Sequence, residues 1–285
     1  MAAGFPLYFN LWHKLGIYAI RAYAVAVLFF LILPILVIIP LSFNSEPFFT
    51  FTQGMMTFQA EAYSLRWYHE IVENPNWVLA IKNSFIIGIF ATIVATVLGT
   101  IAAVGLASPE MPLKRSITAL LLSPMIVPLI ISAAGMFFFY SRIGLQGTHL
   151  GVILAHAALG TPFVVITVTA TLVGFDQSLI RAGYMCGASL PRVFFKVIMP
   201  LILPGVISGA LFAFVTSFDE VVVVLFVGSV DQRTIPWQMF SGIREQISPT
   251  ILAVATLLVC VSIALLTVVE LLRRRTERLR GITPT

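Results

Sequence analysis

The fold of this chain is decided by uncharged apolar stretches, of which residues 84–107, SFIIGIFATIVATVLGTIAAVGLA, are a clear example. An α-helix needs about 20 apolar residues to cross the roughly 30 Å hydrocarbon core of a bilayer, and this stretch is long enough. The same test, applied outward along the chain, selects six segments. We therefore predict an all-α membrane protein with about six transmembrane helices. The segments cover approximately residues 20–41, 84–107, 116–140, 150–173, 201–226 and 251–272.

The composition supports a membrane protein and excludes several other classes. The chain is 59% hydrophobic and only 10% charged, against about 25% charged residues in ordinary soluble domains. The net charge of +5 does not indicate a nucleic-acid partner, because the basic residues lie at helix ends and form no stripe. Cys186 and Cys260 are the only cysteines, too few for a disulfide framework or a thiolate metal site.

The distribution of Lys and Arg predicts that both termini are cytoplasmic. With this orientation the cytoplasmic segments hold Lys14, Arg21, Lys114, Arg115, Arg181, Arg192, Lys196, Arg273, Arg274, Arg275, Arg278 and Arg280. The outer segments hold only Arg66, Lys82, Arg142, Arg233 and Arg244. This asymmetry satisfies the positive-inside rule. The first apolar run is also too long for a cleavable signal, so we expect it to remain as the first spanning helix.

The sequence also predicts features of the long outer loop and a kink in the third segment. The long outer loop, residues 42–83, carries Trp67, Tyr68 and Trp77, which favours a short helix or aromatic anchors at the membrane interface. Pro124 and Pro128 lie in the third segment and predict a kink there.

The cytoplasmic segment 174–200 is too polar and interrupted to lie in lipid, and its pattern predicts two short helices joined by a turn at residues 187–191. Gly187 can adopt the positive φ that ends a helix sharply. Ser189 is placed to cap the second helix, with Pro191 in its first turn. Such an element is either a rigid knob that a partner grips or a loop helix that packs beneath its own bundle.

The sequence of this segment resembles the "EAA" loop of permease subunits of bacterial ATP-binding-cassette (ABC) importers. The family pattern is Glu-Ala-Ala, three variable residues, Gly-Ala-Ser, then a Phe, an aliphatic residue and Leu-Pro. The matching residues are Ala182, Gly187, Ala188, Ser189, Phe194 or Phe195, Ile198 and Pro200. The departures are Arg181 in place of Glu, Gly183 in place of the second Ala, and Met199 in place of Leu.

The resemblance implies the fold and partners of a type I ABC importer permease. It implies one transmembrane permease domain, residues 1–285, in the bacterial inner membrane, with segment 174–200 as the coupling loop. The implied partners are two ATPase subunits, a second and homologous permease, and a periplasmic or lipid-anchored solute-binding protein. ATP and Mg²⁺ would be bound by the ATPase subunits, with no cofactor in this chain. The implied ATPase-coupling residues are Arg181, Ala182, Gly183, Cys186, Gly187, Ala188, Ser189, Pro191, Phe194 and Pro200.

Within the family, the chain is most similar to permeases of the spermidine/putrescine branch. The similarity is carried by residues 217–223, SFDEVVV, and by Ile247-Ser248-Pro249. It implies import of a polyamine or a related small cation. Opine, phosphonate and iron(III) permeases are similar enough that these solutes stay open.

Asp219 and Glu220 are the most informative residues within the predicted spans. An ionisable residue at this depth is costly and marks a functional site by default, and an acidic pair suits a cationic solute. Successive helical residues differ by about 100° in direction, so we do not expect both to face one pathway. The alternatives are an ion pair with Arg142 or a partner's cation, or capping of a broken helix. Trp237 is a third candidate for the pathway, with an interfacial anchor as its alternative.

The chain carries no motif for catalysis or nucleotide binding. There is no phosphate-binding Gly-rich Lys-Ser/Thr motif, so we predict a transport subunit and not an enzyme. His149 and His156 are seven residues apart but have no third ligand nearby, and we expect no metal site. An ion-coupled secondary transporter is the alternative transport class, although such folds often show an internal repeat and none is evident here.

Overall fold

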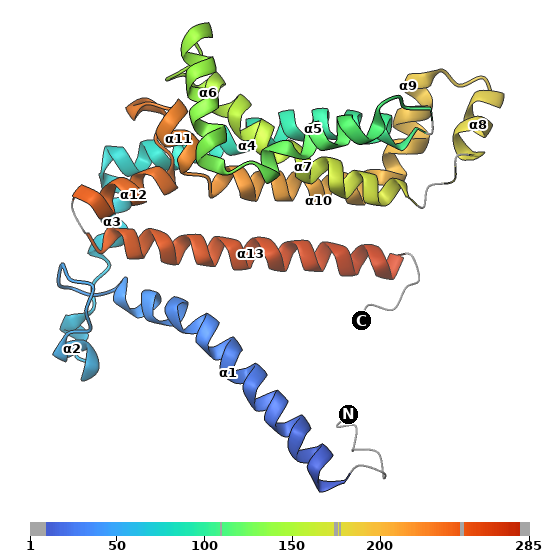
Figure 1. The fold of residues 1–285 in the computed structure, drawn as a ribbon. Helices are drawn as coiled ribbons and strands as arrows, with labels where there is room; N and C mark the ends of the chain where they lie inside the picture. Colours follow the sequence, from blue (N-terminus) through green and yellow to red (C-terminus); the bar gives the residue numbers. More distant parts are fainter. Residues whose placement is uncertain (1–9, 109, 174–175, 177, 246–247, 280–285) are drawn as a thin grey trace. The chain divides into compact units, whose positions relative to one another are not determined.

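The structure is a computed structural model that describes residues 10–108, 110–173, 176, 178–245 and 248–279 (Figure 1). Its regular secondary structure is helical. The chain divides into two compact units, one formed by residues 74–244 and the other by residues 1–73 with 245–285. Each unit is described by itself, and the assignment of the whole chain to one permease domain stays a prediction.

Helices are present at all six predicted segments, and most of them are longer than expected. The helices α1 (Leu11–Leu41), α4 (Pro75–Ala107) and α7 (His149–Leu172), and the run Leu190–Phe218, are each long and apolar enough to span a membrane. α4 begins nine residues before the predicted apolar stretch. Its start follows from Asn74, whose side chain accepts a hydrogen bond from the backbone N–H of Asn76, and from Pro75 in the first turn.

The third predicted span is broken rather than gently kinked. It consists of α5 (Lys114–Ile126) and α6 (Leu129–Ile143), which meet at an angle of 103°. The break lies at Val127 and Pro128, both in extended conformations. A proline disfavours the helical conformation of the residue before it, which explains why the helix stops there.

The fifth predicted span differs from expectation at both ends. Helix α9 (Leu190–Val193) continues through a π-helical turn, Phe194–Ile198, into α10 (Met199–Phe218). α10 itself starts close to the predicted residue 201, with Pro200 in its first turn, but the helical run that contains it already begins at Leu190. α10 then ends at Phe218, and a separate helix, α11 (Val222–Val227), follows.

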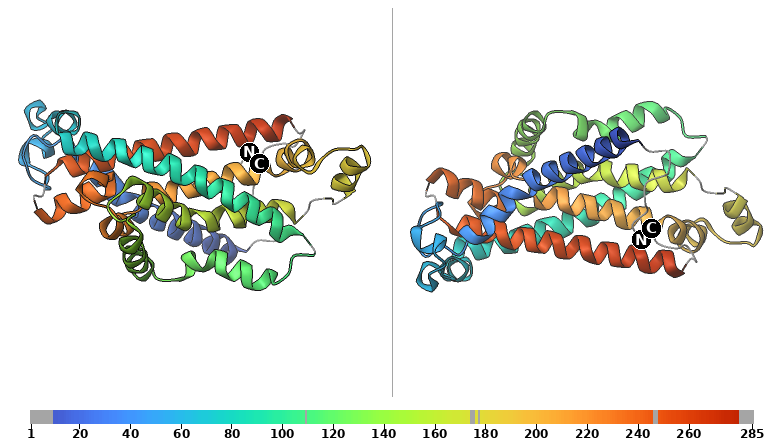
Figure 2. Two further views of the ribbon diagram at one scale, coloured as in Figure 1. Left: turned by 90° about the horizontal axis from the view of Figure 1, so that it is seen from above. Right: turned by 90° about the horizontal axis from the view of Figure 1, so that it is seen from below.

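Unit 74–244 is built on three helices, α4, α7 and α10, that pack along one another (Figures 1 and 2). Glycines permit this close approach. A Cβ on Gly99 of α4 would lie 2.6 Å from Val164 Cβ of α7, and one on Gly209 of α10 would lie 2.8 Å from Val164 Cα. Membrane helices commonly use such small residues where their backbones approach.

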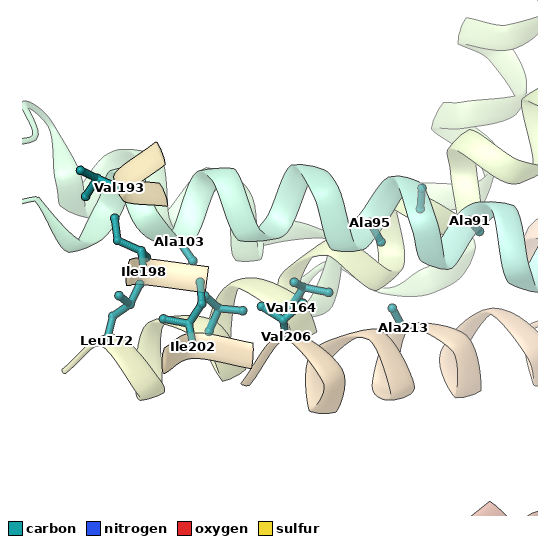
Figure 3. Packing of buried hydrophobic residues seen from close by; sticks show 12 residues of the cluster. Ala91, Ala95, Ala103, Val164, Leu172, Val193, Ile198, Ile202, Val206 and Ala213 are labelled. Carbon is teal, nitrogen blue, oxygen red and sulfur yellow. The ribbon is translucent and has the colours of Figure 1, made fainter. Parts of the chain in front are cut away.

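The core of this unit follows from the same packing. Small and branched side chains from the three helices and α9 form one buried cluster (Figure 3). A second cluster joins α4 and α7 to α6 and α11. Its members are Ile87, Ala133, Tyr140, Val152, Ala155, Leu159, Val223, Val224 and Val227. The unit also contains α8 (Ser178–Met185), the short turn Val230–Gln232 and α12 (Ile235–Glu245).

The other unit consists of α1, the outer segment and α13 (Thr250–Leu279). The outer segment forms α2 (Gln53–Met56), the turn Ala60–Ala62 and α3 (Arg66–Glu73). Trp67 of α3 is buried and donates its indole N–H to the carbonyl of Asn44 at 2.7 Å. The predicted short helix is thus present, but Trp67 ties the outer segment together rather than lying free at an interface.

α13 corresponds to the sixth predicted span. Its described apolar part, Thr250–Ala264, is shorter than a full membrane crossing. It is joined to α3 by the Thr250 hydroxyl, which donates to Glu70 Oε2 at 2.6 Å.

Candidate functional site: a cytoplasmic coupling element and a broken spanning helix

The first half of the predicted coupling segment is the helix α8. Its start is capped by Asp176, whose Oδ1 accepts a hydrogen bond from the backbone N–H of Ser178 at 2.8 Å. Hydrogen bonding to Ser178, helped by the nearby charge of Arg181, lowers the pKa of the Asp176 carboxyl. The helix therefore begins with a fixed negative charge, which favours the positive end of its dipole.

The turn that follows α8 has the predicted geometry. Gly187 has a φ of +75°, and the backbone N–H of Ala188 donates back to the carbonyl of Gly183 at 3.1 Å. Such a left-handed residue with a returning hydrogen bond is how many helices end. Ser189 occupies the capping position before α9, with Pro191 in the first turn, but its side chain makes no capping hydrogen bond. The expectation of a side-chain cap at Ser189 is therefore wrong.

Side chains of α9 and of the π-helical turn after it are packed into the core of unit 74–244. Val193 and Ile198 are buried in the first cluster, beside Phe194. A Cβ added to Gly183 would lie 3.1 Å from Val193 Cγ2, so α8 lies directly on α9. α8 is thus in contact with a helix that continues into α10.

The exposed surface of the α8–α9 element carries both apolar and basic side chains. Met185 is 90% exposed, and Leu190 and Phe195 are each 66% exposed. Of the predicted coupling residues, Gly183, Ala188 and Phe194 are half-buried, and the others are exposed. The exposed ones are Arg181, Ala182, Cys186, Gly187, Ser189, Pro191 and Pro200. This exposure leaves the face free for a partner.

The two adjacent acids at the end of α10 have different environments. Glu220 is buried, and its Oε1 accepts a hydrogen bond from the backbone N–H of Val223 at 3.0 Å. Glu220 therefore caps α11, one of the alternatives for a broken helix. Asp219 is exposed, and within the described part of the chain neither a hydrogen bond nor an ion pair engages its carboxylate. The structure thus separates the pair into a capping acid and an available one.

A buried histidine holds α7 to the end of α10. His156 Nδ1 and Ser217 Oγ lie 2.8 Å apart and share a hydrogen bond. Both side chains are buried, and His156 Nε2 has no partner among the described residues. Ser217 lies in the last turn before the helix break.

A second polar contact anchors the chain after α11. The Asn83 amide of α4 donates to the carbonyls of Asp231 and Arg233 at 2.7 and 3.0 Å. Its oxygen accepts from His149 Nε2 at 3.0 Å. An amide oxygen can only accept, so His149 must carry its proton on Nε2. The segment between α10 and α12 is thus held at both of its ends, each time with the help of a histidine of α7.

The structure also shows the surroundings of the two histidines of α7 and of Trp237. His149 and His156 serve separate hydrogen bonds, and no group of three or more His, Cys, Asp and Glu in the described ranges could hold a metal ion. Trp237 of α12 is half-buried against the second cluster, with the Arg233 guanidinium 5.3 Å from its ring centroid. Its assignment to the solute pathway stays a prediction.

The helices that are long and apolar enough to cross a bilayer define a membrane protein. Residues 95–279 match the family described as "Binding-protein-dependent transport system inner membrane component". The chain therefore belongs to this family and is a permease component of a bacterial ABC importer. It is a multi-pass protein of the inner membrane and works with ATPase and binding-protein partners. The ion-coupled secondary transporter is accordingly set aside.

Two sequence relatives and one solved structure are similar to this chain. The spermidine/putrescine transport system permease protein PotC of Haemophilus influenzae is 30% identical over 90% of this chain and 96% of its own. The putrescine transport system permease protein PotI of Escherichia coli K12 is 31% identical over 80% of this chain and 81% of its own. The crystal structure of a bacterial ABC transporter involved in alginate import has a chain with a TM-score of 0.70. It is 15% identical, with coverage of 93% and 99%, and shows a shared fold.

Sequence reasoning missed the contacts that hold the broken span. The sequence marks Ser217 only as part of the stretch 217–223 and gives Asn83 no role. A signal was present, because polar side chains flanking or interrupting an apolar span need partners when buried. Their partners lie 61 to 150 residues away, a separation that no local pattern reveals.

Proposed function

We propose that this chain is one of two homologous permease subunits that together import a polyamine such as putrescine or spermidine, or a similar small cation. The proposal rests on the available Asp219 carboxylate at a break in a spanning helix, and is supported by similarity to permeases named for spermidine and putrescine. A protonated amine can pair with such a carboxylate in a site of low dielectric, where the attraction is stronger than in water.

In this proposal the break after α10 makes Asp219 accessible to a solute. Where α10 ends, backbone groups are freed from helical hydrogen bonding, and such non-helical backbone is tolerated at membrane depth only inside protein or beside a water-filled cavity. Glu220 satisfies one of these groups, the N–H of Val223. Asp219 is left free to meet a solute.

We further propose that the ATPase subunits dock on the α8–α9 element. A motion of the ATPase pair would push α8, and the rigid contact of α8 with α9 would carry it into α10. Arg181 stands where the family pattern has Glu, so the ATPase contact at this position would involve a group of negative charge. The second permease subunit could carry the usual pattern in its own loop.

The function is tested by uptake of radiolabelled putrescine into vesicles that hold the complete transporter and its cognate binding protein. We expect the wild type to import putrescine and the variant Asp219→Asn to import it about 10- to 100-fold more slowly, since it loses a charge-assisted contact of about 1.5–3 kcal/mol. Asp231→Asn, an exposed outer acid, serves as the control and should retain uptake.

A binding-protein measurement separates the remaining solutes. Calorimetric titration of the cognate binding protein with putrescine, spermidine, an opine, a phosphonate and Fe³⁺ should show tight binding of the polyamines alone. Tight binding of one of the other solutes, with no polyamine uptake, would overturn the polyamine proposal.

A further inference from the structure

The hydrogen bond between His156 and Ser217 is buried and joins α7 to the last turn of α10. Both residues are in spanning helices, and their exposed fractions are 1% and 4%. Water is scarce in such an interior, so the 2.8 Å bond cannot readily be exchanged for one to solvent. The bond therefore holds the last turn of α10 at one rotation relative to α7.

The packing around the bond tightens the same arrangement. One turn along, Gly160 of α7 faces Ala213 of α10 so closely that a Cβ on Gly160 would lie 3.0 Å from Ala213 Cβ. On another side, the Phe218 ring lies between those of Phe85 and Phe214, with centroids at 5.4 and 5.3 Å. The end of α10 is thus held by polar and apolar contacts together.

Asp219 follows directly after this held turn. Ser217 lies two residues before it, and Glu220, one residue after it, is fixed by capping α11. A rotation of the last turn of α10 would carry the Asp219 side chain with it, because Asp219 follows Phe218 directly and its backbone is still in the right-handed helical region. The two flanking contacts therefore decide where the free carboxylate points.

We propose that His156, acting through Ser217, is a positioning residue that aims the Asp219 carboxylate at the amine of a cationic solute. The proposal rests on the proposed function of Asp219. It assigns His156 neither a metal nor a proton-transfer role, and neither His156 nor Ser217 needs to touch the solute.

The test uses the complete transporter in vesicles with its cognate binding protein, and radiolabelled putrescine as the probe. The readout is putrescine imported per ATP hydrolysed, which a general loss of folded protein would not change. Ser217→Ala removes one oxygen and should lower this ratio about 3- to 10-fold, the effect of one hydrogen bond, while ATP hydrolysis stays within about twofold. Thr100→Val is the matched control, since the buried Thr100 hydroxyl of α4 has no hydrogen-bond partner among the described residues, and it should leave the ratio unchanged.

A double variant decides whether the contact acts on Asp219. If it does, Ser217→Ala combined with Asp219→Asn should be no worse than Asp219→Asn alone, since there is no carboxylate left to aim. His156→Gln, which keeps a hydrogen-bonding group, should be milder than His156→Phe. Multiplying defects in the double variant, or a normal ratio in Ser217→Ala beside a defective Asp219→Asn, would overturn the positioning role. A normal ratio and uptake rate in Asp219→Asn would instead overturn the proposed function.

Discussion

At the residue scale, neighbouring side chains of the same chemistry have different tasks. Glu220 is buried and caps α11, whereas Asp219 is exposed at the end of α10. The Glu220 carboxylate accepts a hydrogen bond from the first turn of a helix, whereas no partner engages the Asp219 carboxylate within the described residues. Counting both acids would therefore overstate by one the number of carboxylates here that have no partner within the described chain.

Gly187 is the residue on which the geometry of the coupling turn depends. Its φ of +75° is costly for any residue with a Cβ, by about 1 kcal/mol, although nothing lies within 4 Å of a Cβ built there. We expect Gly187→Asp to abolish putrescine uptake and uptake-linked ATP hydrolysis with normal amounts of protein in the membrane. Quantitative immunoblotting and vesicle assays measure the two effects.

The control for this variant is Gly16→Asp in α1. Gly16 is also exposed and has open space around it, but its φ is not positive. It receives the same new charge without the backbone strain and should keep its coupling. Coupled uptake by Gly187→Asp at the wild-type rate would contradict the assignment of α8–α9 as the docking element.

At the scale of elements, the three-helix core of α4, α7 and α10 depends on glycines at the helix contacts. Gly99 and Gly209 place the backbones of α4 and α10 against Val164 of α7. The close contacts of α10 with α7 pack the helix that follows α9 against the core of this unit.

This packing predicts opposite effects for one substitution at two helical glycines. Gly209→Ala should lower the thermal midpoint of the purified transporter, because the new Cβ would lie 2.8 Å from Val164 Cα and overpacking costs about 1–3 kcal/mol. Gly105→Ala has open space and should keep or raise the midpoint, since alanine favours a helix by about 0.5–1 kcal/mol. Equal midpoints for the two variants would show that the α7–α10 contact tolerates an added methyl group.

At the scale of the whole molecule, this chain is a permease component and not the source of energy for transport. Members of its family work with ATPase and binding-protein partners. We expect vesicles that contain this chain alone to take up no putrescine, with or without ATP. Uptake should require the complete transporter, ATP on the cytoplasmic side and the binding protein outside. Uptake by the chain alone under an ion gradient would contradict this dependence.

The sequence by itself determined the class of protein and the layout of two short helices joined by a turn at Gly187. Apolar length and the positive-inside pattern are properties of single segments, and the turn at Gly187 follows from residues that are close together in the chain. These features need no knowledge of distant contacts, so they could be predicted.

Only the tertiary structure decided the course of the fifth span and the tasks of its polar residues. The break after Phe218, the capping by Glu220 and the bond between His156 and Ser217 depend on which surfaces of α7 and α10 meet. Buried polar groups must find partners wherever the fold brings them. Ser217 and Glu220 have hydrogen-bond partners, whereas the Asp219 carboxylate has none within the described chain.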